Sequence, residues 1–282
     1  MIGDTVISQK CAFIIVTYNS KDDIKECVLS IKTYHPECGI YLIDNNSTDG
    51  TKELIQTIEN INLTILQVNS GFAGGSNLGI KKALKDNYEY FFLFNPDARI
   101  YKKTINSLIN LSKIKKGLVG PIIKDFYSGE IQSIGGKFYP IFSYFRIIKK
   151  HNNLIKNYVK IDWILGAALL ISKEIINKCG YLDENFFPGY FEDNDYRYRI
   201  IQSGASVDAI PLQANHDRSS TLNSSVEFQK RNQYTFQKNY KYYVEKWGGS
   251  PTQEKYDRPF GKDYPLSFWE FDPVRRQKLR WI

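Results

Sequence analysis

Three carboxylates fall within four residues in the second half of the sequence, at Glu192, Asp193 and Asp195. Aromatic side chains in residues 186–191 precede them, so full exposure to water is not expected. Carboxylates that are close together and partly desolvated raise one another's pKa, which lets one of them accept a proton near neutral pH. The alternative is a solvated, acidic start of a helix. Arg199 follows Asp195 by one helical turn, which predicts a structural ion pair.

Asp97 and His216 are two other side chains of types that occur in metal sites. Asp97 ends the sequence Asn95-Pro96-Asp97, which composition alone would assign to a turn. His216 is one of three histidines, and an isolated histidine is more often a surface or core residue than a ligand. It follows an expected strand at 207–211.

Elements that could position these residues are visible in the first third of the chain. Short, β-rich apolar runs occur at 12–17, 40–43, 63–68 and 90–94. Continuous apolar character is typical of strands buried on both faces. Apolar residues at helical spacing lie between these runs, first within 24–31. The alternation predicts an α/β fold with a mainly parallel sheet covered by helices.

Each of these four runs is followed by a polar or glycine-rich cluster, at 18–20, 44–50, 69–77 and 95–97. In parallel sheets, ligands bind beyond the carboxyl ends of the strands. The sequence therefore predicts a polar ligand across this edge of the sheet.

The glycine-rich cluster contains Gly71, Gly74, Gly75 and, further on, Gly79. Such a segment can form a tight turn before a helix, or it can let backbone N–H groups approach a phosphate. It has neither the Gly-Lys-Ser/Thr of a Walker A loop nor a GxGxxG pattern. Spacing alone leaves both interpretations open.

The composition is that of a globular protein. The chain has 282 residues, of which 42% are hydrophobic and 24% charged, so wholesale disorder is excluded. No run of 18 apolar residues occurs, and the first residues lack the pattern of an export signal, so we expect a cytoplasmic location. The four cysteines show no zinc or paired spacing, and we expect free thiols.

The formal net charge of +8 is concentrated at the C-terminal end. Residues 228–282 contain 12 basic and 6 acidic side chains, an excess of +6. A basic segment can contact phosphates of nucleotides, lipids or nucleic acids, although a solvated surface is the more frequent case. No nucleic-acid-binding motif accompanies it, so we expect no nucleic-acid partner. Aromatic and basic residues mix at 266–281, which suits an anionic membrane face, packing on the catalytic domain or contact with a second subunit.

Eight motifs in a fixed order resemble the family 2 glycosyltransferases, and within them the rhamnosyltransferase-like branch. The motifs span about residues 11–235 and are VTYN at 16–19, IDNNSTDGT at 43–51, NSGFAGGSNLG at 69–79, NPD at 95–97, WILGAALL at 163–170, GYLDENFF at 180–187, YFEDND at 190–195 and NH at 215–216. The resemblance implies the GT-A fold, with a Rossmann-like half fused to an acceptor-binding half. We therefore expect a nucleotide-sugar-binding half at 1–100, an acceptor-binding and catalytic-base half at 101–225, and a helical, basic extension at 226–282.

The resemblance also implies a donor site. Thr17 and Tyr18 would line the base pocket, and Asp44 would accept the N3–H of uracil or thymine, for which a carboxylate is a good acceptor. Asp44 could instead form only a turn, as could Asn45, and Asp49 is expected to cap the following helix. The residues expected to bind the nucleotide-sugar are Thr17, Tyr18, Asn19, Asp44, Asn46, Gly71, Phe72, Gly74, Gly75, Asn77, Asn95 and Asp97.

Further implied roles concern the cation, the base and the acceptor. Asp97 occupies the last position of the family's Asp-x-Asp and would bind Mn²⁺ or Mg²⁺, although Asn95 departs from that pattern. His216 would be a further metal ligand. Asp193 is expected to be the catalytic base, in preference to Glu192. The acceptor would contact Trp163, Gly166, Ala167, Glu192 and Arg231. Residues 126–146 could form an acceptor loop or a lid.

The function that the resemblance implies is inverting, metal-dependent transfer of L-rhamnose from dTDP-rhamnose to a lipid-linked or growing bacterial surface glycan, such as an O-antigen. The enzyme would act in the cytoplasm or peripherally at the inner face of the plasma membrane. A UDP-sugar donor, carrying glucose, galactose or galactofuranose, stays open. A sugar nucleotidyltransferase is a candidate from another class, but it should carry a basic, glycine-rich loop after the first strand, where this chain has Tyr18-Asn19. The oligomeric state is not predicted.

Overall fold

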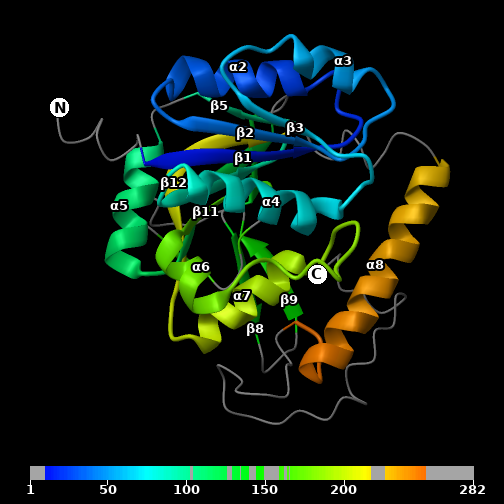
Figure 1. The fold of residues 1–282 in the computed structure, drawn as a ribbon. Helices are drawn as coiled ribbons and strands as arrows, with labels where there is room; N and C mark the ends of the chain where they lie inside the picture. The colour runs from blue at the N-terminus through cyan, green and yellow to red at the C-terminus, as the bar shows by residue number, and fades with distance from the viewer. Residues whose placement is uncertain are drawn as a thin grey trace.

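A single mixed sheet with helices on both faces forms the centre of the molecule (Figure 1). The computed structural model describes residues 10–251 apart from 102–103, 126–128, 134, 140–143, 149–158, 162–163, 165 and 217–225. In this part of the chain the sheet has ten strands, eight of them in the order β10-β12-β6-β11-β4-β1-β2-β3, with β5 beside β12 and β7 beside β6. A separate two-stranded sheet pairs β8 with β9.

The elements alternate along the first half of the chain and become irregular in the second. The helices are α2 (Ile24–Tyr34), α3 (Thr51–Gln56), α4 (Gly71–Lys85), α5 (Ile105–Lys115), α6 (Lys173–Cys179), α7 (Glu192–Gln202) and α8 (Val226–Trp247). The strands are β1 (Cys11–Thr17), β2 (Gly39–Asp44), β3 (Asn62–Ile65), β4 (Tyr90–Phe94), β5 (Ala98–Ile100), β6 (Leu118–Asp125), β7 (Ile131–Ser133), β8 (Gly135–Tyr139), β9 (Tyr144–Ile148), β10 (Val159–Ile161), β11 (Ala168–Ser172) and β12 (Val207–His216).

The four strands expected from continuous apolar runs are present and parallel. β1 pairs with β2 and β4, and β2 pairs with β3. Every residue of β1 and β4 is buried, which explains why these runs lack an alternating pattern. The third strand is shorter than expected, because it ends at Ile65 and Val68 is 74% exposed. Among the described strands, β3 is the edge of the sheet and has no partner on its outer side.

The glycine-rich segment is a helix from its first glycine, which corrects the expectation of a loop at 69–77. α4 begins at Gly71 and lies across β1 and β2. A Cβ on Gly75 would stand 2.8 Å from Cγ1 of Val16, and one on Gly79 would stand 2.6 Å from Cγ2 of Ile14. These glycines let the helix approach the sheet more closely than residues with side chains would. Close packing thus outweighs the poor helix propensity of glycine.

The second half of the chain extends the same sheet with mostly antiparallel strands. β11 pairs with β4 and β6 in antiparallel orientation, and β12 pairs with β6 in parallel. The strand expected at 207–211 continues to His216 and passes a register shift between Ile210 and Gln213. The expected mainly parallel sheet is therefore confirmed around β1, and the antiparallel additions are features that the sequence pattern did not reveal.

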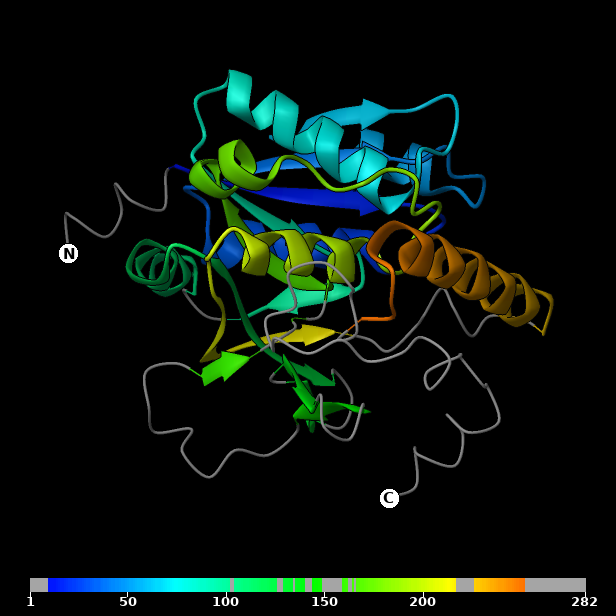
Figure 2. The ribbon, with the colours of Figure 1, turned by 90° about the horizontal axis from the view of Figure 1, so that it is seen from below.

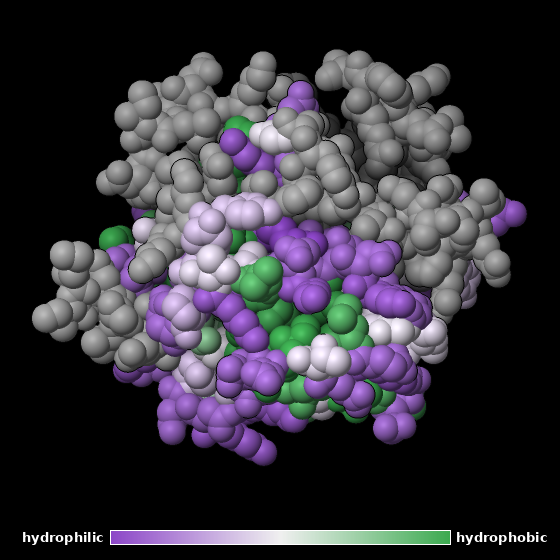
Figure 3. Space-filling view, turned by 90° about the horizontal axis from the view of Figure 1, so that it is seen from above, coloured by the Kyte–Doolittle hydropathy of each residue, from purple (hydrophilic) through white to green (hydrophobic). Residues whose placement is uncertain are grey.

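α8 lies beside the sheet rather than in the helical layers (Figures 1 and 2). Its inner face contacts the segment before α7 through an aromatic cluster that includes Phe186, Phe191 and Tyr243. The face of the molecule that carries α2 and α3 is largely hydrophilic with an interrupted apolar area (Figure 3). Among the described helices, none combines the length and the apolar character that crossing a bilayer requires.

Candidate active site

The carboxyl ends of β1 and β2 meet at the first part of the site. Thr17 and Asp44 are register partners there, and both side chains are buried. The Asp44 carboxylate accepts hydrogen bonds from the backbone N–H of Ser47, at 3.0 Å, and from the Ser47 hydroxyl. Asp44 therefore holds the turn after β2, as one of the two interpretations of the sequence predicted. Each carboxylate oxygen has two lone pairs, so the Asp44 carboxylate can accept a hydrogen bond from a further donor.

The loops after β1 and β2 are tied to each other. The Asn19 N–H donates to the Ser47 hydroxyl at 2.9 Å, and the Asn19 side chain accepts the N–H of Thr48 at 2.8 Å. Asn19 and Asn46 both have positive φ, of 52° and 64°, a conformation that asparagine tolerates better than most residues. Lys52 donates to the Asn46 side chain. The two asparagines thus shape the edge of the sheet at which β1, β2 and β4 end, here called the strand-end edge. They do so through their backbones as well as their amides.

Asp49 connects the same two loops to the start of α3. Its carboxylate accepts the N–H of Thr51 at 3.0 Å and that of Lys21 at 3.2 Å. Burial alone would raise the pKa of Asp49, but the hydrogen bonds from Thr51 and Lys21 lower it overall. Asp49 thus binds the first N–H of α3, but Gly50 occupies the N-cap position and carries no side-chain cap, so the expectation that Asp49 is the cap was wrong in position.

Asn45 is a positioning residue that the sequence did not single out. Its side-chain N–H donates to the Gly71 carbonyl at 3.0 Å, and its side-chain oxygen accepts the N–H and the hydroxyl of Ser70, at 3.1 and 2.9 Å. One buried amide therefore joins the end of β2 to the first turn of α4. The signal was weak, because an asparagine after a strand is also a common turn former.

Backbone donors at the start of α4 are engaged by the protein itself. The Gly71 N–H donates to the Asn69 side chain at 2.7 Å, and the Phe72 N–H donates to the Pro188 carbonyl at 2.8 Å. Asn77 binds both backbone groups of Leu182. These contacts join α4 to the segment that leads into α7.

The sugar-nucleotide role of this helix start was predicted for Gly71, Phe72, Gly74, Gly75 and Asn77. What the structure describes for them is packing and connection to residues 182–188. Binding of the donor by these five residues stays a prediction.

Asn95-Pro96-Asp97 forms the turn between β4 and β5, at the same edge of the sheet. The Asn95 N–H donates to the Ala167 carbonyl at 3.0 Å, which joins the turn to the motif at 163–170. The Asp97 side chain is half-buried. Arg99 lies close by and is ion-paired with Asp23 at 3.2 Å.

The second predicted metal ligand is brought to this turn by strand pairing. His216 is the last residue of β12 and the register partner of Ala98, the residue after Asp97. On its other side, β12 places His216 opposite Asp125 of β6. Asp125 is a carboxylate that the sequence did not single out, because only the β6–β12 register brings it here.

The predicted base lies next to the predicted acceptor motif. A Cβ on Gly166 would stand 3.8 Å from Oδ2 of Asp193, so the Asp193 side chain faces this glycine. Asp193 is half-buried, and its Oδ1 accepts the backbone and side-chain N–H groups of Asn194, at 2.8 and 2.9 Å. Asp193, Gly166 and the Asn95–Asp97 turn are therefore connected through adjacent contacts.

Glu192 is in a different environment from its neighbour. It is only 8% exposed, and burial together with the charge of Asp193 raises its pKa to about 8. At neutral pH such a carboxyl group is largely protonated. The sequence predicted that close carboxylates raise one another's pKa, and in the structure it is the pKa of Glu192 that is raised.

Asp195 is structural, as expected. Its carboxylate is fully buried and binds Arg199 at 2.8 Å, Lys246 at 2.7 Å and the Trp247 indole N–H at 2.9 Å. The i,i+4 pair with Arg199 is therefore confirmed. The contacts from α8 are additional and anchor its C-terminal turn on α7.

The sequence of residues 12–178 matches the model of glycosyl transferase family 2. The chain belongs to this family. The matched segment includes the loops after β1, β2 and β4 and the motif at 163–170, and it ends before α7. The matched residues thus include the strand-end edge but not Glu192 and Asp193, so the roles of these two carboxylates depend on other observations.

Two relatives of this chain have names that describe sugar transfer. A dTDP-rhamnosyl transferase of Shigella flexneri, RfbF, is 26% identical over 207 residues, which are 70% of this chain and 65% of the relative. The low-salt glycan biosynthesis hexosyltransferase Agl10 of Haloferax volcanii is 24% identical over 198 residues, 70% of this chain and 63% of the relative. The chain thus spans slightly less than two thirds of the length of these relatives.

Solved structures confirm the expected GT-A fold. GalNAc-T7, crystallised with UDP, GalNAc and Mn²⁺, superposes with a TM-score of 0.68 at 17% identity, over 96% of this chain and 53% of that one. Residues 1–349 of TarS from S. aureus give a TM-score of 0.52 at 16% identity, over 84% and 73% of the two chains.

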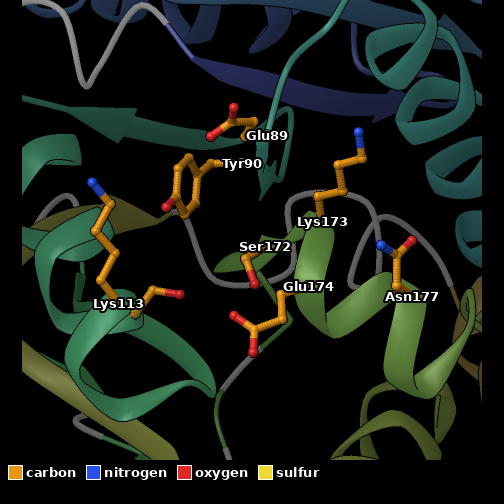
Figure 4. A pocket seen from close by; sticks show the side chains of 8 residues that line it. Glu89, Tyr90, Lys113, Ser172, Lys173, Glu174 and Asn177 are labelled. Atoms are coloured by element: carbon orange, nitrogen blue, oxygen red, sulfur yellow. The ribbon is translucent and has the colours of Figure 1, made fainter.

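Two other features of this family 2 member lie away from the strand-end edge. A cavity of about 390 Å³ is lined by Glu89, Tyr90, Lys113 and Glu174 among others (Figure 4). It lies at the beginning of β4, whereas the Asn95–Asp97 turn follows the end of that strand. Its lining carries both signs of charge and contains none of the predicted site residues.

A group of metal-ligating types is also present away from the site. Ligand atoms of His35, Glu37 and Cys38 lie within 4.8 Å of one another, between the end of α2 and the start of β2. However, Nε2 of His35 accepts the Thr104 N–H at 3.2 Å, so in the neutral ring Nδ1 carries the proton. Nδ1 is also the nitrogen that faces Glu37, at 3.6 Å. A protonated nitrogen cannot ligate a cation, so we interpret the group as structural.

Several predicted positions cannot be compared with the structure. Trp163 and the tail at 252–282 lie outside the described residues, and so do the side chains of His216 and Arg231. Their predicted roles, including membrane contact of the tail, stay predictions. The segment 126–146 is described in part, as the strands β7 and β8 and the start of β9, and its role as an acceptor loop or lid stays a prediction. Tyr18 is described and half-buried at the end of β1, with no contact that decides its role.

Proposed function

We propose that this chain is an inverting, metal-dependent glycosyltransferase that moves L-rhamnose from dTDP-rhamnose to a lipid-linked or oligosaccharide acceptor in surface-glycan synthesis. The observation that carries the proposal is the connection between Asp193, Gly166 and the turn at Asn95–Asp97. It places a carboxylate beside the edge where the sheet ends, which is where a nucleotide would bind in a fold of this kind.

Asp193 is the proposed base that takes the proton of the acceptor hydroxyl as the hydroxyl oxygen attacks the anomeric carbon. The C–O bond to the diphosphate breaks on the opposite face, so the configuration inverts without a covalent glycosyl-enzyme. Glu192, with its pKa near 8, is largely protonated at pH 7 and is therefore a poor acceptor of that proton. Its role would be to contact the acceptor beside Asp193 as a neutral carboxyl group that can donate a hydrogen bond.

The residues at the strand ends fit a divalent cation and a nucleotide. Asp97 lies in the turn just before β5, and His216 pairs in register with Ala98, the next residue. We propose that the Asp97 carboxylate holds Mn²⁺ or Mg²⁺, for which oxygen ligands are suited, and that His216 is a further ligand. When bound, the cation would neutralise the charge of the leaving diphosphate. Within the described residues, the buried Thr17 hydroxyl has no hydrogen-bond partner. An unpaired buried hydroxyl is costly, so it supports contact with a polar atom of the base.

The proposed donor is inferred from the names of relatives and not from contacts of side chains in this structure. The relative RfbF is named a dTDP-rhamnosyl transferase, which favours dTDP-rhamnose. Agl10 is named a hexosyltransferase, and the GalNAc-T7 structure was determined with UDP, so a UDP-hexose is the alternative donor. We also propose that the basic C-terminal segment brings the enzyme to the membrane surface that carries a lipid-linked acceptor.

The test is calorimetric binding of dTDP-rhamnose, UDP-glucose and UDP-galactose, each with Mn²⁺ and with a chelator. We expect dTDP-rhamnose to bind in the presence of Mn²⁺ and to lose most of its affinity with the chelator. Preference for a UDP-sugar would overturn the choice of rhamnose but keep the reaction class. If no nucleotide-sugar binds with Mn²⁺ present, the proposed function is wrong.

A further inference from the structure

The segment just before the two carboxylates has an unusual backbone. Tyr190 and Phe191 have positive φ angles of 75° and 73°, a region that residues with large side chains rarely adopt. Two successive residues in this conformation persist only where surrounding contacts hold them. Such strain before a candidate base suggests that the conformation itself serves the site.

This backbone conformation fixes where α7 begins. Phe191 is the N-cap of α7, and its carbonyl accepts the Asp195 N–H at 2.9 Å. Glu192 and Asp193 are therefore the first two residues of the helix. A change in the dihedral angles at 190–191 would rotate both carboxylates relative to Gly166.

Asn239, in the middle of α8, holds this turn. Its side chain is fully buried, and its Nδ2 donates to the Gly189 carbonyl at 2.7 Å and to the Tyr190 carbonyl at 3.3 Å. Both protons of one amide are thus used on consecutive carbonyls. The opposite orientation of the amide would place its oxygen against the same two carbonyl oxygens, so the donor orientation is the one that electrostatics favours.

Aromatic contacts from the same helix support the turn. The Phe236 ring lies 5.7 Å from that of Tyr190 and 4.8 Å from that of Phe191, between ring centroids. The C-terminal turn of α8 is anchored on α7 by the bonds of Lys246 and Trp247 to Asp195. α8 therefore contacts both the turn and the helix that follows it.

We propose that Asn239 is a positioning residue for the transfer reaction: by binding the Gly189 and Tyr190 carbonyls, it fixes the turn that aims Asp193 at the acceptor. This role rests on the proposed function. It predicts an effect on turnover and not on donor binding, because Asn239 binds carbonyls of the turn before α7, whereas the residues expected to bind the nucleotide lie at the ends of β1, β2 and β4 and at the start of α4. A misplacement of a base by about 1 Å can lower a rate on the order of 100-fold.

The test compares Asn239→Asp with Gln237→Glu. Both change an amide to a carboxylate on α8, but Gln237 is exposed and serves as the matched control. In Asn239→Asp the donor N–H groups are replaced by an oxygen that faces two carbonyl oxygens. The measurements are kcat and KM for the donor, with active sites counted by calorimetric titration with dTDP and UDP in the presence of Mn²⁺.

We expect kcat per nucleotide-binding site to fall at least 30-fold in Asn239→Asp, with the donor KM and the nucleotide Kd within about threefold of wild type. Gln237→Glu should match wild type. A purely structural role would lower the number of binding sites and leave kcat per site unchanged, which would overturn the proposal.

A second variant covers the case in which Asn239→Asp does not fold and binds no nucleotide. Asn239→Ser keeps a small hydroxyl donor and adds no charge, and its kcat per site should fall at least fivefold. An unchanged kcat in this variant would also overturn the role of Asn239. If the wild-type chain transfers sugar from none of the donors, the proposed function fails instead, and the positioning role fails with it.

Discussion

Gly166 lies directly against Asp193, so that a Cβ built on the glycine would stand 3.8 Å from Oδ2 and 3.9 Å from Cβ of the aspartate. The two residues come from different motifs, and the neighbouring Ala167 carbonyl is bound by the Asn95 N–H at 3.0 Å. A glycine at this point keeps the space beside one carboxylate oxygen open. An acceptor hydroxyl that approaches Asp193 would need this space.

Gly166→Ala should therefore impair the acceptor more than the donor. The added methyl group makes only ordinary van der Waals contact with Asp193, so the fold should be kept. We expect kcat/KM for the acceptor to fall about tenfold, since small displacements of a reacting group lower rates strongly. Steady-state kinetics with each substrate varied would test this. An unchanged acceptor kcat/KM would show that the acceptor approaches Asp193 from another side.

Asp193→Asn should abolish transfer while leaving the nucleotide site intact. The amide has nearly the shape of the carboxylate but cannot accept the proton, and loss of a general base typically costs 100- to 10,000-fold, to order of magnitude. The measurement is kcat together with the Kd of dTDP-rhamnose or UDP-glucose in Mn²⁺. Glu192→Gln is the control, because it neutralises a group that is already largely protonated at pH 7. A larger loss in Glu192→Gln than in Asp193→Asn would reverse the assignment of the base.

The parts of the fold that were predicted correctly are those with a local signature. Strands buried on both faces require continuous apolar runs, and the helical extension expected from residue 226 begins at that residue as α8. Strands such as β5 (Ala98–Ile100) were missed, because three residues carry no period and their pairing depends on β12, more than a hundred residues away.

The site was predicted in part for the same reason. Strand-end clusters are recognisable by composition, so Asp44 and Asp97 could be singled out, and Asp193 belongs to a recognisable run of three carboxylates within four residues. Asn45 and Asn239 could not, because each acts on backbone groups that are distant in sequence. For Asn239 the available signal was an amide on the aromatic face of an amphipathic helix, which does not reveal its partner. The helical start at Gly71 was missed because close packing on Val16 overrides the low helix propensity of glycine.

Glu192 should make folding stability depend on pH. Its pKa is raised from the ordinary value of 4.5 to about 8 by burial and by Asp193, so between these values the folded chain holds a proton that the unfolded chain has lost. Stability should therefore fall as pH rises through this window. Glu192→Gln cannot titrate and should gain stability relative to wild type by on the order of 4 kcal/mol between pH 5 and pH 8.5. Denaturant unfolding at both pH values would measure this, and parallel pH dependence of the two proteins would contradict it.

Replacing single glycines of α4 by alanine should show whether each glycine serves packing on the sheet or binding of the nucleotide. In Gly79→Ala the new Cβ would stand 2.6 Å from Cγ2 of Ile14, and such overpacking costs about 1–3 kcal/mol, more than the roughly 1 kcal/mol of helix propensity gained. We expect Gly79→Ala to be destabilised with an unchanged nucleotide Kd. Lys81→Ala, on the exposed side of the same helix, is the control.

Gly75→Ala is the more informative of the glycine variants. Its Cβ would stand 2.8 Å from Cγ1 of Val16 and 3.5 Å from Nδ2 of Asn45. Loss of stability with an unchanged Kd for dTDP or UDP would show that this glycine serves packing alone. A weaker nucleotide Kd at unchanged stability would instead support the predicted contact between the start of α4 and the donor.

Asp183 should stabilise the fold through its contacts with Lys246 and Tyr242 of α8, and this stabilisation should depend on pH. Burial would raise its pKa, but the ammonium of Lys246 at 2.7 Å, the Asn185 N–H at 3.0 Å and the Tyr242 hydroxyl at 2.9 Å lower it to about 2. Because the folded pKa lies below the unfolded value near 3.8, the stabilisation is present above that value and is lost as pH falls towards 2. Asp183→Asn should therefore be destabilised by about 1–3 kcal/mol at pH 7. The difference from wild type should shrink between about pH 4 and pH 2, as measured by denaturant unfolding. The exposed Asp22→Asn should show no such difference at either pH, and a constant deficit of Asp183→Asn across the range would mean that the amide disrupts packing rather than an ion pair.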